Sequence, residues 1–120
     1  EEVWNALLNW GLKISKLEKA FIVDERGLII AMQGGDDSTL EGIESNLLRS
    51  VMQMDHFMGD EPTQSVQIKL KDNWFSSFYL TTQEKGEKHT MIICLTGKDV
   101  LSDKTREKIL QVFNEKLKDL

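Results

Sequence analysis

Apolar residues recur at helical spacing in three stretches of the chain. A helix advances by about 100° per residue, so apolar residues three or four positions apart share one face. The longest stretch runs from Asp37 to Met58, with Ser38 or Thr39 able to cap its start and Gly59 marking its end. The sequence therefore predicts three amphipathic helices with these stripes: Val3, Leu7, Trp10, Ile14 and Leu17; Leu40, Ile43, Leu47, Val51, Met54 and Met58; and, after a cap at Ser102 or Asp103, Ile109, Phe113, Leu117 and Leu120.

The long central helix carries more apolar surface than one sheet needs. Leu48 and Met52 lie beside its main stripe, where they require a second partner. Two interpretations follow from this pattern. The helix is either a two-sided core helix within one chain, or a helix that packs on its own sheet and also on another chain.

Shorter stretches between the helices have the pattern of β-strands. The first two flank the sequence Asp-Glu-Arg-Gly, which is typical of a tight antiparallel hairpin closed by a left-handed Gly27. Asp24 is expected to cap the backbone of this turn, an interpretation that we favour over an acid–base pair with Glu25. Five strands are predicted, with turns at 71–73 and 83–88 in the second group: Ala20–Asp24, Leu28–Gln33, Val66–Leu70, Trp74–Thr82 and His89–Thr96.

The order helix, two strands, long helix, three strands and helix (α-β-β-α-β-β-β-α) predicts an α+β fold. Two helices can cover one face of a five-stranded antiparallel sheet, and the long helix can cover the other. The chain has 120 residues, of which 40% are hydrophobic and 29% charged. A chain of this size can bury a core without disulfides, so we expect residues 1–120 to form a single domain.

The charge and the cysteine content exclude several classes of protein. Fifteen Lys and Arg against twenty Asp and Glu give a net charge of −5, and the lysines are interleaved with acids. This balance argues against nucleic acid or a membrane surface as a partner. Cys94 is the single cysteine and is expected in the core. No apolar run reaches the roughly 18 residues of a membrane helix, so we predict a cytoplasmic domain without membrane insertion.

The sequence contains no recognisable catalytic or cofactor-binding constellation. The glycine-rich stretch at 34–37 lacks both the Walker lysine and the glycine spacing of dinucleotide sites. His56 and His89 fit neither a metal pair nor a triad with Cys94. Because no base, nucleophile and oxyanion donor can be assembled, we predict a non-enzymatic protein without cofactor or metal.

The hairpin sequence AFIVDERGLIIA, from Ala20 to Ala31, resembles the opening hairpin of the Roadblock/LC7 family with its Asp-x-x-Gly turn. The capped helix, the meander from Val66 to Thr96 and the closing helix follow in the family's order, so the resemblance covers nearly the whole chain. Similar hairpins occur in longin and profilin-like domains. Longin domains open directly with a strand, whereas this chain has an apolar helix first.

The resemblance implies a homodimer, or a heterodimer with another Roadblock-like chain, that acts as a scaffold or regulator of a Ras-like small GTPase or as a dynein light chain. Edge strands of two such sheets pair, and the long helices meet beside them. The dimer interface implied here is Leu48, Met52, Asp55, Val66, Ile68 and Leu70. The surface expected to bind the partner is the polar rim around Leu48 and Met52, namely Glu41, Glu44, Arg49, Gln53 and His56.

A small-ligand sensor of the PAS or GAF kind is the alternative function. Those folds also combine an antiparallel sheet with helices. Such a sensor requires a cavity between sheet and helix, and here the lining would be Phe21, Met32, Met54 and Phe78.

Overall fold

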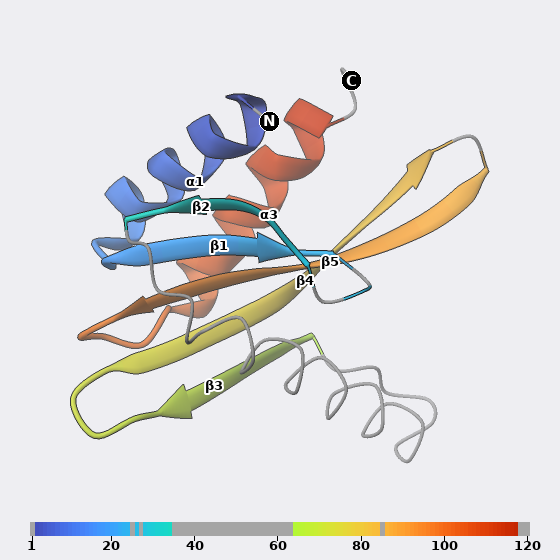
Figure 1. Cartoon of the computed structure of the whole chain (residues 1–120). Helices are drawn as coiled ribbons and strands as arrows, with labels where there is room; N and C mark the ends of the chain where they lie inside the picture. The colour runs from blue at the N-terminus through green and yellow to red at the C-terminus, as the bar shows by residue number, and fades with distance from the viewer. Residues whose placement is uncertain (1, 25, 27, 35–63, 85, 118–120) are drawn as a thin grey trace, which may run out of the picture.

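The computed structural model describes residues 2–24, 26, 28–34, 64–84 and 86–117. Within these ranges the chain forms two helices and one five-stranded antiparallel sheet (Figure 1). The predicted helix at 37–58 lies outside the described residues. The elements are α1 (Glu2–Ser15), β1 (Lys19–Val23), β2 (Ile29–Gln33), β3 (Ser65–Lys69), β4 (Trp74–Glu84), β5 (Glu87–Gly97) and α3 (Asp103–Leu117).

The described strands lie in the order β2-β1-β5-β4-β3, and every neighbouring pair is antiparallel. The opening hairpin therefore pairs through β1 with β5, the last strand of the meander. This order places β2 at one edge of the sheet and β3 at the other. The predicted α+β class and five-stranded antiparallel sheet are confirmed.

Both α1 and α3 pack on the same face of the sheet (Figure 1). Strand side chains alternate between faces, and on this face they meet the apolar stripes of the two helices. The rings of Trp4 and Phe113 lie 6.4 Å apart between the helices, and Gly11 is buried where α1 passes Ile109. The core on this face consists of Leu7, Leu8, Leu17, Ala20, Ile22, Ala31, Phe78, Leu80, Ile93, Leu95, Leu101, Ile109 and Phe113.

The opposite face of the sheet has its own apolar cluster. Phe21, Val23, Phe75, Ile92 and Cys94 are each at most 2% exposed, and the rings of Phe21 and Phe75 lie 6.3 Å apart. Neither α1 nor α3 contributes to this cluster. The expectation that Cys94 is a small core residue is confirmed.

The connection from α1 to β1 is tight. Lys16 has a φ of 61° and its N–H bonds the carbonyl of Leu12, so a left-handed residue ends the helix. Glu18 then donates its N–H to the carbonyl of Thr96. A Cβ at Gly97 would lie 2.7 Å from Leu17 Cδ2 and 3.1 Å from Leu17 Cα, so β5 ends directly against this junction.

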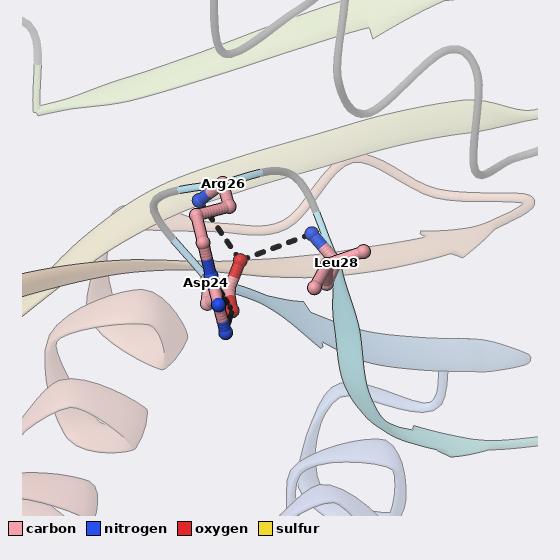
Figure 2. Close-up of polar contacts among 3 residues, drawn as sticks. All are labelled: Asp24, Arg26 and Leu28. Carbon is pink, nitrogen blue, oxygen red and sulfur yellow. Dashed lines mark hydrogen bonds and ion pairs between the residues drawn. The ribbon is translucent and has the colours of Figure 1, made fainter.

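Asp24 closes the opening hairpin as the sequence predicts (Figure 2). Its Oδ1 accepts hydrogen bonds from the backbone N–H groups of Arg26, at 2.9 Å, and of Leu28, at 3.0 Å. Its Oδ2 pairs with the Arg26 guanidinium at 3.1 Å. Partial burial of Asp24 disfavours its charged form, but the hydrogen bonds from Leu28 and Arg26 outweigh this effect and lower the pKa of the carboxyl. Gly27 lies outside the described residues.

Asp24→Ala is expected to reduce the free energy of unfolding by about 1 to 2 kcal/mol at pH 7, because two backbone donors lose their acceptor. Since folding lowers the pKa, the contribution is present above about pH 4, the ordinary range of an aspartate. It is lost as the pH falls through the lowered folded-state value. Urea titrations of both proteins between pH 7 and pH 2.5 test this. The difference between their free energies of unfolding should shrink on acidification, and a difference that grows would contradict the prediction.

One detail of the sequence interpretation needs correction. The chain turns within the predicted segment 83–88, but the turn is shorter than predicted, because β4 continues to Glu84 and β5 begins at Glu87. The cap at the last helix is confirmed: Ser102 Oγ accepts the Thr105 N–H at 3.2 Å.

Candidate interaction edge

The candidate site is the edge of the sheet formed by β3. This strand pairs with β4 in the register Ser65↔Phe78 to Lys69↔Trp74, and no described residue pairs with its other side. An edge strand presents a row of backbone donors and acceptors that another strand can use.

Two backbone hydrogen bonds define which residues of β3 face outwards. Tyr79 donates its N–H to the carbonyl of Gln64, and Leu70 donates to the carbonyl of Asn73. Backbone groups alternate in direction along a strand, so the even-numbered residues of β3 point toward β4. The N–H and C=O groups that point off the edge therefore belong to Ser65, Gln67 and Lys69.

Side chains of β3 separate into an apolar and a polar face. Val66 and Ile68 are half-buried, and Ile68 packs on the apolar cluster of the face opposite α1 and α3. Leu70, just after the strand, is 46% exposed. On the other face, the Lys69 ammonium lies 5.4 Å from the centroid of the Trp74 ring.

The central residue of the edge is tied to the body of the domain. Gln67 donates from Nε2 to the carbonyl of Leu101 at 2.7 Å, and the Leu101 N–H bonds Ser76 Oγ at 3.5 Å. Leu101 itself is buried at the entrance to α3. These contacts hold β3 against β4 and the loop before α3, so the edge is supported by the fold on its inner side.

Part of the predicted dimer interface can be placed in the structure. Val66 and Ile68 lie two residues apart on β3 and so share one sheet face, and Leu70 directly follows the strand. The remaining predicted interface and partner-binding residues lie outside the described residues: Leu48, Met52, Asp55, Glu41, Glu44, Arg49, Gln53 and His56.

The sequence analysis missed the residues whose main-chain groups face the open edge. Ser65, Gln67 and Lys69 have polar side chains, which the hydrophobic pattern assigns to a solvent-exposed face. Hydrophobic alternation identifies the buried face but not the side to which each N–H points, because that depends on the register with β4. No signal in the sequence of β3 alone reveals this register.

The cavity required for a PAS- or GAF-like sensor is not formed as predicted. Phe21 and Met32 pair with each other and belong to one sheet face, whereas Phe78 belongs to the core on the other. Their partners on β5 explain the difference, because Phe21 faces Cys94 and Phe78 faces Ile93, and adjacent strand residues point to opposite faces. Met54, the fourth predicted lining residue, lies outside the described residues.

Among the described residues, no helix is long and apolar enough to cross a membrane. In the same part of the chain, no group of three or more His, Cys, Asp or Glu side chains is placed to hold a metal ion.

These features define a class of protein: an α+β domain with two helices on one sheet face and an edge strand, β3, whose outer side pairs with no described residue. A scan against models of protein families and a search of curated proteins found no match. Solved structures are similar, however. MglB from Myxococcus xanthus has a TM-score of 0.72 at 13% identity, with 98% of this chain and 97% of that chain covered.

A Roadblock/LC7 domain from Streptomyces avermitilis has a TM-score of 0.68 at 11% identity, with coverage of 94% and 96%. An MglB structure with a tetrameric arrangement has a TM-score of 0.59 at 11% identity, with coverage of 92% and 79%. At such identities the likeness concerns the fold. The chain has the Roadblock/LC7 fold, which confirms the resemblance carried by the hairpin Ala20–Ala31.

Proposed function

We propose that this chain is a non-enzymatic dimeric scaffold or regulatory module that binds a Ras-like small GTPase or a related regulatory protein. The observation that carries the proposal is the edge strand β3, which leaves three outward-pointing residues without a described partner in a Roadblock/LC7 fold. The partner class comes from the resemblance to that family.

The alternation of β3 suggests one arrangement of the dimer. Two copies related by a two-fold axis pair antiparallel, and only outward-pointing residues can exchange hydrogen bonds. A pairing centred on Gln67 brings all five residues of each strand into register. Ser65 then faces Lys69 of the second copy, and Val66 faces its Ile68. Polar residues meet polar ones and apolar meet apolar, which favours this register.

The similarity to MglB with a tetrameric arrangement supports association between copies, since that protein assembles. The long helix predicted at 37–58 would complete the interface through Leu48, Met52 and Asp55. The partner would bind the adjoining polar rim of Glu41, Glu44, Arg49, Gln53 and His56. Any nucleotide hydrolysis would take place in the partner, because the sequence contains no phosphate loop.

The test is a titration with the Ras-like GTPases of the same genome, each loaded with a non-hydrolysable triphosphate or with diphosphate. We expect binding of one GTPase with a preference for one nucleotide state. Arg49→Glu should weaken this binding at least tenfold, whereas Lys108→Glu, an equal charge change on the exposed side of α3, should leave it unchanged. The proposal fails if no candidate binds in either state, or if the isolated domain turns over GTP.

A further inference from the structure

We draw no further inference here: the strongest candidate, the side-chain cluster in the first turn of α3 where Ser102 caps the helix and the buried Nε of Arg106 has no acceptor among the described residues, carries no proposal, because it rests on a helix N-terminus whose arginine already pairs with Asp103 at 3.4 Å.

Discussion

Gly34→Ala is expected to lower the free energy of unfolding by about 3 kcal/mol or more, a large part of the stability of a domain this size. Gly34 has a φ of 87°, which costs an alanine roughly 1 to 2 kcal/mol. In addition, a Cβ at this position would overlap the carbonyl oxygen of Glu18. A backbone atom cannot move aside as a flexible side chain can, so the end of β2 would have to separate from the start of β1.

Gly86→Ala is the matched control for this variant. Gly86 has a φ of 82°, nearly that of Gly34, but a Cβ there would find no atom within 4 Å. Its substitution should therefore cost only the backbone strain, about 1 to 2 kcal/mol. Denaturant unfolding gives the loss of unfolding free energy for each variant, and the difference between the two losses is the contribution of the overlap with Glu18. Equal losses of stability would show that the close approach of Gly34 to Glu18 does not add to the destabilisation caused by Gly34→Ala.

The sensitivity of Gly34 has a structural origin in the connection between α1 and β1. The helix ends at Ser15 and the strand begins at Lys19, so the chain reverses within three residues. Gly97 approaches this junction from β5, and Gly34 approaches it from β2. Both close approaches are between residues far apart in sequence. The sequence analysis therefore identified neither glycine as a packing position.

Local patterns were sufficient to predict most of the described fold. The apolar spacing of the first and last helices, the hairpin closed by Asp24 and the alternation in Val66–Leu70 depend on neighbours a few residues apart. Such signals can be read without knowing the fold. The order of helices and strands then limited the number of possible sheet arrangements, and the hairpin sequence indicated the Roadblock/LC7 fold.

Features that depend on register could not be predicted in the same way. The residues 83–88 are polar and contain Gly86, a pattern typical of a turn, yet β4 and β5 pair through Glu84 and Glu87. Likewise, the polar side chains of Ser65, Gln67 and Lys69 gave no indication that their backbone groups point away from β4. Phe78 was grouped with Phe21 and Met32 as the lining of one cavity, although it lies on the other sheet face, because its strand partner was unknown. In each case a long-range pairing decides the outcome.

Gln67→Pro is expected to raise the dissociation constant of the proposed dimer about 100-fold. In the pairing centred on Gln67, its N–H in each copy donates to the other copy, so the substitution removes two hydrogen bonds. At about 1.5 kcal/mol each, and with 1.4 kcal/mol for a factor of ten, the loss is about 100-fold. The domain itself should stay folded, because this N–H points away from β4 and proline is tolerated at such edge positions.

Gln67→Ala is the control, because it also loses the 2.7 Å hydrogen bond from Gln67 Nε2 to Leu101 but retains the backbone N–H. It should therefore remain as dimeric as the parent. Sedimentation equilibrium of the three proteins over the micromolar range gives the dissociation constants directly, and thermal unfolding confirms that each is folded. Equal constants for the proline and alanine variants would exclude the Gln67 N–H from the interface. A parent that is monomeric at tens of micromolar would exclude a stable dimer altogether.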